Sequence, residues 1–396
     1  MKIAIVAPKV NLETGGGSHL SLVLYGAGLQ GLGCETDVYS LNAVSPGSRD
    51  EMMQAGLPLH DLGGLEPAEQ AERLGRVKSD VLLFDANLPL AYHVKRRFPA
   101  QRVVAHLNTL SGFCTNLARQ AAGCWLTCRH LDRVRHHPGP AAQRLRFAAL
   151  GALRVADLAR GFRSLDGWVF PSPQTADAYR LYGLDPDRCV VVPESLDLEH
   201  IGRFRAAAFG TSGGPVTVLY VGMLPEYKGM SLLFDALRRV HVPWRVRIYG
   251  DGDDRGRVLA FAADFPGRVD YRGHVPNRDI FPELDGGDFL FVHPCLWFEA
   301  LGRGILEAMA LEIPVVVPDV GGPAWSVRDG VTGLHYRHRD PADLARRIEW
   351  AVAHPDETRR LATRGREASV AYDYRTVARG WRDALERILE KSGPRG

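Results

Sequence analysis

Two glutamates eight positions apart, Glu299 and Glu307, are the residues of this 396-residue chain best suited to ligand chemistry. They bound the segment EALGRGILE, which follows an apolar run and continues into a helical pattern. Because eight residues slightly exceed two helical turns, we expect Glu299 in a loop and Glu307 two turns into the helix. Leu301 and Gly302 then lie at the helix N-terminus, where free N–H groups suit a phosphate or sugar oxygen. The alternative is a pair of solvated helix glutamates.

A second candidate for phosphate binding is the glycine run Gly15-Gly16-Gly17 before a helical pattern over Ser18–Gln30. Glycines let the backbone approach a ligand, and a helix N-terminus favours an anion. The run lacks the G-x-G-x-x-G spacing of dinucleotide sites, and so does the segment Gly250–Gly256. We therefore expect no nicotinamide cofactor, and the alternative for the run is a flexible surface turn.

His106 ends the apolar run Arg102–His106, a place from which a side chain points toward the ligand edge of a parallel sheet. Asn108 and Ser111 follow it and could support it. A lone histidine is more often structural, but this position favours a functional role.

Three cysteines and a histidine form a cluster that could bind a metal: Cys114, Cys124, Cys128 and His130. Three thiols and an imidazole can make a tetrahedral zinc site, but the usual C-x2-C spacing is absent. We favour ordinary loop thiols and predict no required metal.

The stretch Arg129–Arg163 interleaves basic and apolar residues, as in a helix that lies on an anionic membrane. An ordinary helix with its arginines facing water is the interpretation we favour.

Composition excludes several classes of protein. The chain is 45% hydrophobic and 24% charged, with a formal net charge of +3, which is too mild for a duplex-binding protein. The N-terminal apolar run is too short for a signal peptide, and no stretch has the 18 or so apolar residues of a membrane span. We expect a cytoplasmic protein, with peripheral contact at the inner membrane face as the alternative.

Short apolar runs alternate with helical patterns throughout the chain, which predicts doubly wound parallel sheets. Expected strands in the first half are Lys2–Ala7, Thr36–Leu41, Asp80–Phe84, Arg102–His106, Gly167–Pro171 and Cys189–Pro193. Those in the second half are Val216–Val221, Arg245–Tyr249, Val269–Tyr271, Phe289–Val292 and Val315–Val317. We predict two Rossmann-like α/β domains that face a central cleft, over residues 1–208 and 216–373, with a linker at 209–215. A helix at 374–391 is expected to pack back on the first domain.

The Glu299/Glu307 segment resembles the E-x7-E signature of family 4 retaining glycosyltransferases, which have the GT-B fold. The resemblance continues upstream through YVGMLPEYKG, Gly250-Asp251-Gly252 and YRGHV, and downstream through PVVVPDVGGPAW. It covers about residues 216–340 in order and is looser in the N-terminal half. The resemblance implies an enzyme that transfers a sugar from a nucleotide-diphosphate sugar to a hydroxyl-bearing acceptor.

The same resemblance implies roles for individual residues. Glu307 would bind the ribose hydroxyls, and Glu299 the hydroxyls of the transferred sugar beside the Leu301–Gly302 backbone. Lys228 would neutralise the diphosphate, and the His274–Val275 backbone would meet the base. Carboxylates accept hydrogen bonds from vicinal diols, and a cation stabilises charge on a departing diphosphate.

Further roles concern the loops around the donor. By the resemblance, Gly16 and Gly17 belong to a loop that closes over the substrates, and His106 lies near the transferred sugar. The position after Gly222 is usually an arginine in this family but is Met223 here, so a charged contact to the leaving group is missing. Arg303 is a candidate replacement, and an exposed arginine is the alternative.

The resemblance also implies retention of configuration by front-face attack, without a metal, in which the leaving diphosphate helps to deprotonate the acceptor hydroxyl. Two other hypotheses remain open at this point. One is a sugar-nucleotide epimerase on a similar double-Rossmann frame. The other, suggested by Met223, is a non-catalytic protein that binds sugar nucleotides.

Overall fold

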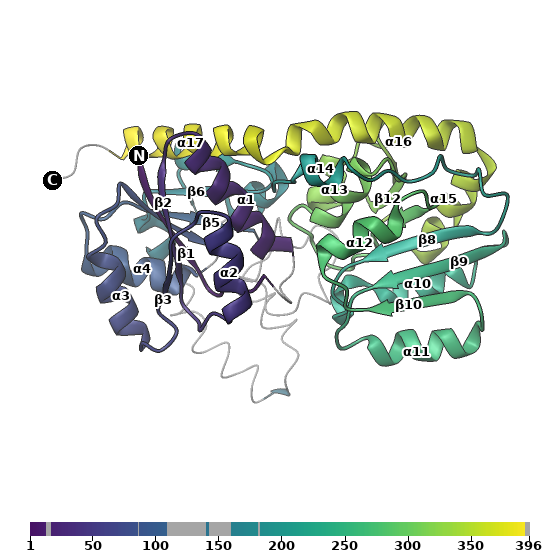
Figure 1. Ribbon diagram of the computed structural model, residues 1–396, viewed down its shortest axis with the longest axis horizontal. Coiled ribbons are helices and arrows are strands. Elements are labelled where there is room, and N and C mark those ends of the chain that lie inside the picture. Colours follow the sequence, from purple (N-terminus) through teal and green to yellow (C-terminus); the bar gives the residue numbers. More distant parts are fainter. Residues whose placement is uncertain (13–16, 86, 109–139, 142–159, 181–182, 393–396) are drawn as a thin grey trace. The chain divides into compact units, whose positions relative to one another are not determined.

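The computed structural model of this chain divides it into two compact units (Figure 1). It describes residues 1–12, 17–85, 87–108, 140–141, 160–180 and 183–392. The first unit holds the described residues up to Ser195 and those from Tyr374 onward. The second unit holds Leu196–Asp373. Gly16, the cysteine cluster, Ser111 and nearly all of the basic stretch 129–163 lie outside the described residues.

The division falls before Leu196, upstream of the 209–215 segment expected as the linker. Leu196, Ile201 and Ala206 are buried in the hydrophobic core of the second unit. Ala206 also donates its backbone N–H to the carbonyl of Leu311 at 3.0 Å. Residues 196–208 therefore pack with the second unit, although no glycine or proline run marks the change in the sequence.

In the first unit, the described residues form a seven-stranded parallel sheet of order β3-β2-β1-β4-β5-β6-β7. Its strands are β1 (Lys2–Ala7), β2 (Glu35–Ser40), β3 (Leu59–Asp61), β4 (Val81–Asp85), β5 (Val103–His106), β6 (Gly167–Phe170) and β7 (Cys189–Val191). Six of these match expected strands within a residue or two at each end. The edge strand β3 was not predicted, because its sequence LHD is not a continuous apolar run.

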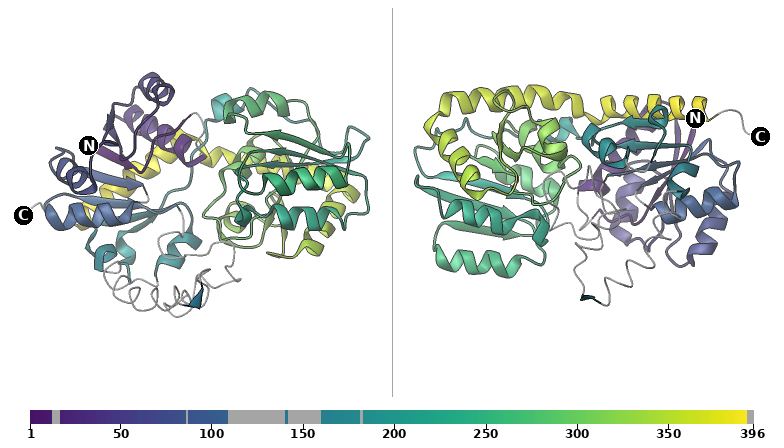
Figure 2. Two further views of the ribbon diagram at one scale, coloured as in Figure 1. Left: turned by 90° about the horizontal axis from the view of Figure 1, so that it is seen from below. Right: turned by 180° about the vertical axis from the view of Figure 1, so that it is seen from behind.

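Helices cover both faces of this sheet (Figure 2). They are α1 (Gly17–Gly31), α2 (Pro46–Gln54), α3 (Pro67–Gly75), α4 (Leu88–Arg97), α8 (Pro173–Arg180) and α17 (Tyr374–Lys391), with a 3-10 turn η2 (Pro186–Arg188). The C-terminal helix α17 lies beside α1, as Figure 1 shows in yellow and purple. Trp381 and Leu385 of α17 are fully buried in the core of this unit. At Gly28 of α1, an added Cβ would lie 2.6 Å from Ala378, so the two helices approach closely.

In the second unit, the described residues form a six-stranded parallel sheet of order β10-β9-β8-β11-β12-β13. Its strands are β8 (Val216–Val221), β9 (Trp244–Tyr249), β10 (Val269–Gly273), β11 (Leu290–Val292), β12 (Val315–Pro318) and β13 (Leu334–Tyr336). Five strands were expected; the short edge strand β13 was not. The fold class, two doubly wound α/β domains, is confirmed.

The helices of the second unit also lie on both faces of their sheet. They are α9 (Leu198–Ile201), α10 (Met230–Leu237), α11 (Arg255–Asp264), α12 (Asn277–Leu284), α13 (Arg303–Ala310), α14 (Gly321–Ser326), α15 (Pro341–Ala353) and α16 (Pro355–Ser369), with 3-10 turns η3 (Glu226–Lys228) and η4 (Val370–Tyr372). No helix among the described residues of either unit combines the length and apolarity needed to cross a bilayer.

Strand order fixes where ligands should bind in each sheet. The chain winds in opposite directions from β8 and from β11, so these neighbours form the topological switch point of the second unit. In the first unit the switch lies between β1 and β4. Ligands of such sheets bind outside the carboxyl ends of the strands at the switch. Those ends continue into the loops that carry Lys228 and Glu299, and β4 ends at Asp85.

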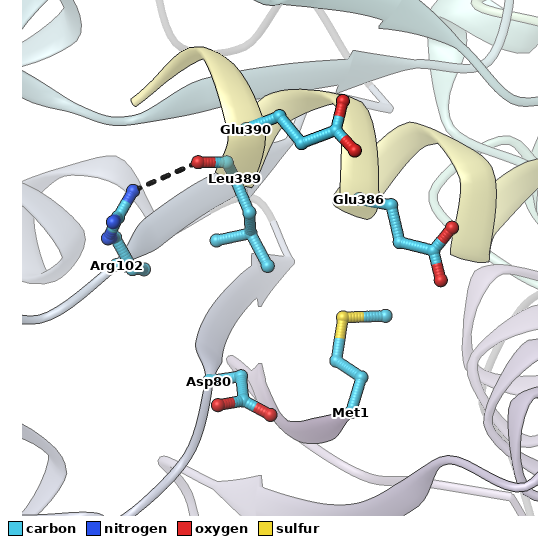
Figure 3. Close-up of a pocket in the computed structure, with 6 residues that line it drawn as sticks. All are labelled: Met1, Asp80, Arg102, Glu386, Leu389 and Glu390. Carbon is cyan, nitrogen blue, oxygen red and sulfur yellow. Dashed lines mark hydrogen bonds between the residues drawn. The ribbon is translucent and has the colours of Figure 1, made fainter. Parts of the chain in front are cut away.

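A shallow pocket of about 380 Å³ lies at the opposite, amino edge of the first sheet (Figure 3). Residues just before β1, β4 and β5 line it together with α17: Met1, Asp80, Arg102, Glu386, Leu389 and Glu390. Arg102 Nη1 donates to the Leu389 carbonyl at 3.2 Å, which ties α17 to this edge. The pocket contains none of the predicted site residues.

Gly229 determines how the two loops of the second switch point meet. Its φ is +82°, and an added Cβ would lie 2.0 Å from the carbonyl oxygen of Pro294. Any larger residue would therefore meet both the left-handed penalty and a backbone clash. The close approach places the end of the β8 loop against the start of the β11 loop.

We predict that Gly229→Ala lowers the free energy of unfolding of the second unit by about 2–4 kcal/mol, from strain and overpacking together. Gly213→Ala is the matched control, since Gly213 has φ +64° but nothing within 4 Å of an added Cβ. This control should lose only about 1 kcal/mol. Chemical denaturation followed by fluorescence measures both, and equal losses would contradict the packing argument.

Candidate functional site

The loop after β11 holds Glu299 in a buried position beside the loop after β8. Lys228, at the end of η3, forms an ion pair through Nζ with Glu299 Oε2. The exposed fractions of the two side chains are only 18% and 11%. The indole Nε1 of Trp297 donates to the same oxygen at 3.0 Å. The structure therefore brings together two residues that the sequence analysis singled out separately, 71 positions apart.

The charges of this pair are strongly coupled. Burial has the largest single effect and would raise the pKa of Glu299, but the Lys228 ammonium and the contact with His293 together hold that pKa well below its usual value. Burial would likewise lower the pKa of Lys228, but Glu299 raises it well above its usual value. Both groups are therefore ionised at neutral pH, as a pair without net charge.

Two further side chains face Glu299. His293 Nε2 lies 3.6 Å from Oε2, and Cys295 Sγ lies 3.8 Å from it. Burial lowers the pKa of His293 and raises that of Cys295 well above its usual value, so both are neutral near pH 7. Among the described residues, these three form a cluster of metal-type ligands, within 4.8 Å of one another. Lys228 pairs with Oε2 of the carboxylate in this cluster.

Aromatic rings cover the pair. Trp297 and Tyr227 lie with ring centroids 4.8 Å apart, and Lys228 Nζ lies 5.2 Å from the centroid of Trp297. Such a cation–π contact adds to the ion pair where water is excluded. Three residues of this site were not predicted from the sequence, although they lie in the loop after β11 that leads to Glu299: His293, Cys295 and Trp297.

Glu307 lies on α13, as predicted, but only about one turn from its start, because the helix begins at Arg303 and not nearer Glu299; its side chain is 7% exposed. Arg303 Nε donates to Glu307 Oε1 at 2.8 Å, one helical turn apart. Asn277, the first residue of α12, places Nδ2 at 3.3 Å from both carboxylate oxygens. Gly302 precedes α13 with φ +91°, which turns the chain from the loop into the helix. Arg303 is thus buried against Glu307, not solvent-exposed, and its role at a diphosphate stays a prediction.

The expected base-contacting segment His274–Val275 lies between β10 and α12. Asn277 connects this segment to Glu307 through the hydrogen bonds described above. Gly222 and Met223 follow β8, and the Met223 side chain is 53% exposed. Tyr220 Oη donates to the Met223 carbonyl at 2.7 Å, which fixes this turn. An apolar side chain therefore stands half-exposed at the switch point, where the family resemblance led us to expect an arginine.

In the first unit, His106 ends β5 as predicted, and its side chain is 6% exposed. His106 Nδ1 lies 3.1 Å from Asp85 Oδ1, and Asn108 Nδ2 donates to the same oxygen at 3.3 Å. Asp85 was missed by the sequence analysis, although it ends the neighbouring strand β4. Gly17 begins α1, as the expected helix start required.

We predict that Lys228→Met destabilises the protein by about 3–5 kcal/mol at pH 7, because it leaves Glu299 buried without its partner. Without Lys228, burial raises the pKa of Glu299 above its unfolded value, so the deficit is fully present above the folded pKa. The deficit should shrink as the pH falls through that pKa toward about 4.

Denaturant unfolding of wild type and variant at pH 7 and pH 5 measures this difference. The double variant Lys228→Met/Glu299→Gln is the control, since it removes the stranded charge and should recover part of the loss. A deficit that stays constant with pH, with no recovery in the double variant, would exclude a stranded carboxylate.

Two family models match this chain, one in each half. Residues 16–195 match the model described as "Glycosyl transferase 4-like domain", and residues 205–368 match "Glycosyl transferases group 1". Together these matches cover most of the sequence.

Curated relatives agree with the family matches. The chain is 34% identical over 166 residues to the lipopolysaccharide core biosynthesis glycosyltransferase LpsE of Rhizobium meliloti, covering 41% of this chain and 47% of the relative. It is 32% identical over 189 residues to the D-inositol 3-phosphate glycosyltransferase of Geodermatophilus obscurus, covering 43% and 42%. The matches thus span somewhat less than half of the length of either relative.

Solved structures show the same fold. HepE of Anabaena, solved in complex with UDP, superposes with a TM-score of 0.71 over 98% of this chain and 100% of that one, at 18% identity. The lipopolysaccharide outer core galactosyltransferase WaaB superposes with a TM-score of 0.68 at 16% identity, over 98% of this chain and 99% of that one. The two family matches, the relatives and the paired parallel sheets lead to one assignment. The chain belongs to the group 1 glycosyltransferases of the GT-B fold.

Proposed function

We propose that this chain is a retaining glycosyltransferase that moves a sugar from a nucleotide-diphosphate sugar to a hydroxyl-bearing acceptor without a metal. The observation that carries the proposal is the placement of Lys228 and Glu299 at the switch point of the second unit, with Glu307 on the helix that follows. A diol-binding carboxylate, a cation and a second carboxylate are the groups that a nucleotide sugar requires. HepE, which has the same fold, was solved in complex with UDP and with UDP-glucose.

Glu307 has the capacity to bind the ribose. A carboxylate offers about four acceptor positions. Arg303 and Asn277 take part of this capacity, mainly at Oε1, and hold the group in one orientation. The positions left over suit the two hydroxyls of a vicinal diol. Because the side chain is already fixed, little conformational entropy is lost when the diol binds.

Glu299 and Lys228 are suited to the sugar and the diphosphate. Lys228 and Trp297 both bind Oε2 of Glu299, while Oε1 accepts no hydrogen bond from the described residues. A sugar hydroxyl can donate to Oε1. The ammonium of Lys228 has three donors, one of which serves Glu299, so two can meet phosphate oxygens. The same cation then stabilises the charge that grows on the departing diphosphate.

The proposed reaction is a front-face displacement. The bond between the anomeric carbon and the phosphate oxygen breaks, and the acceptor oxygen bonds to the same face. The acceptor proton passes to the departing diphosphate oxygen. Lys228 supplies positive charge at that oxygen, and the Lys228–Glu299 pair keeps the site neutral before the donor arrives. Positioning and electrostatic stabilisation carry the rate enhancement in this scheme.

We expect one series among UDP, GDP, ADP and TDP sugars to raise the melting temperature of the full chain by about 5 °C or more near saturation. Glu307→Gln should lose most of this shift, because the amide cannot accept two diol hydroxyls on top of its present partners. Glu312→Gln, two residues after the end of α13, is the control and should keep it. A panel in which no nucleotide sugar shifts the wild type would contradict the proposal.

An uncharged side chain at Met223, where the family resemblance implies an arginine, predicts weak catalysis. Met223→Arg should raise kcat/KM for glycosyl transfer by about tenfold, since a second cation at the diphosphate stabilises the transition state. Met223→Leu is the control and should change little. The product of both should keep the anomeric configuration of the donor, as read by NMR.

A chain that binds the nucleotide sugar but transfers nothing, with or without the arginine, would instead be a binding protein. Isomerisation of the donor without transfer would indicate an epimerase.

A further inference from the structure

The strongest unassigned feature of the first unit is the contact between Asp85 and His106. The two residues are register partners at the ends of the adjacent parallel strands β4 and β5. His106 Nδ1 lies 3.1 Å from Asp85 Oδ1, and the exposed fractions of the side chains are 6% and 13%. Asn108 Nδ2 donates to the same oxygen at 3.3 Å. Asp85 is thereby fixed from two sides.

This contact decides which ring nitrogen of His106 carries the proton. A carboxylate only accepts hydrogen bonds, so the nitrogen that faces Asp85 must be Nδ1–H. In the neutral ring Nε2 is then an acceptor with a free lone pair. Among the described residues, none donates a hydrogen bond to Nε2. A ligand group that meets Nε2 must therefore bring its own proton, as a hydroxyl does.

Two aromatic rings fix the plane of the imidazole. Tyr25 of α1 and Trp381 of α17 lie edge-to-face with His106, with centroids 6.3 and 5.0 Å away and interplanar angles of 82°. Rings packed in this way restrict rotation about the side-chain bonds. The carboxylate sets the tautomer and the aromatic pair sets the orientation.

Unsatisfied polar atoms next to the pair point to a ligand. Tyr25 Oη and Asn108 Oδ1 are buried and have no hydrogen-bond partner in the described part of the chain. Buried polar atoms without partners are rare in folded proteins, and each needs an explanation. Burial lowers the pKa of His19 of α1, and the nearby charge of Asp85 opposes this effect only in part. Together these groups offer both a donor and acceptors, the complement of a polyol.

We propose that Asp85 is a positioning residue that holds His106 as the Nδ1–H tautomer, so that Nε2 accepts a hydrogen bond from a hydroxyl of a sugar substrate. That the ligand is a sugar rests on the proposed function. The tautomer itself rests only on the geometry of the described residues. The two parts can therefore be tested separately.

The tautomer is measured on the ligand-free full chain labelled with 15N-histidine. Long-range 1H–15N correlation spectra separate protonated from unprotonated ring nitrogens, and His106→Gln identifies the signals of His106. We expect a protonated Nδ1 and an unprotonated Nε2 in the wild type. A signal for protonated Nε2 would overturn the proposal whatever the activity of the chain.

Asp85→Leu removes the acceptor, and Asp85→Ala, which also removes it with a smaller side chain, serves where the leucine variant does not fold. Either variant should show a protonated Nε2 and a fall of about 10- to 100-fold in kcat/KM for transfer. Asp37→Asn is the matched control. Asp37 faces His60 at 3.7 Å on β2 and β3 of the same sheet, so its variant should leave both readings unchanged.

Wild-type kcat/KM in an Asp85 variant with the altered tautomer would overturn the role in substrate binding. A chain with the expected tautomer but no transferase activity toward any sugar nucleotide would refute the proposed function and keep the positioning of His106.

Discussion

The buried ion pair between Lys228 and Glu299 is the interaction on which the second unit's switch point depends. It joins the loop after β8 to the loop after β11, two segments that the sheet places side by side and that the backbone hydrogen bond from Leu296 to the Tyr227 carbonyl also links. Gly229 lets the first loop approach the Pro294 carbonyl, and Trp297 covers the pair from the second. A charge in either loop without its partner would be expensive to bury. The two loops therefore have one favourable arrangement, and that arrangement presents a cation and a carboxylate together.

The two glutamates that open and close the E-x7-E segment have different surroundings, which fits two different tasks. Glu299 is bound to Lys228 and Trp297 through one oxygen, and its other oxygen accepts nothing from the described residues. Glu307 is held by Arg303 and Asn277, which link the start of α13 to the start of α12. An ammonium with spare donors lies next to the first glutamate. This separation is what a donor with a ribose at one end and a sugar at the other would require.

Much of the fold could be predicted from the sequence because its strands are buried on both faces and read as continuous apolar runs. The strands β3 (LHD) and β13 (LHY) were not predicted because a histidine interrupts each short apolar run, unlike in the equally short edge strand β7 (CVV). The division at Leu196 was not predicted, because the residues that follow it pack through scattered apolar contacts. The glycine-rich run FGTSGGP at 209–215 indicated a linker there instead. The positions of Glu299 in a loop and of Glu307 on a helix could be predicted, because helical periodicity is a local property of the sequence.

The partners of the site residues could not be predicted in the same way. The pairing of Lys228 with Glu299 spans 71 positions and depends on strand order, which the sequence pattern does not determine. Asp85 meets His106 for the same reason, through the register of β4 and β5. Arg303 shows the opposite case: it lies one helical turn from Glu307, and that spacing alone indicates the ion pair. Arg303 was predicted only as a ligand of the diphosphate, so its ion pair with Glu307 was not predicted.

The division of work between the two glutamates is tested most directly by isothermal titration of the full chain with a nucleoside diphosphate and with the matching nucleotide sugar. Glu307→Gln should weaken binding of both ligands by a similar factor, because both carry the ribose. Glu299→Gln leaves the Lys228 charge uncompensated, so it should not weaken binding of the diphosphate, but it should weaken binding of the nucleotide sugar relative to that of the diphosphate. Equal weakening of both ligands by Glu299→Gln, or unchanged affinity in Glu307→Gln, would contradict the assignment of sugar to one carboxylate and ribose to the other.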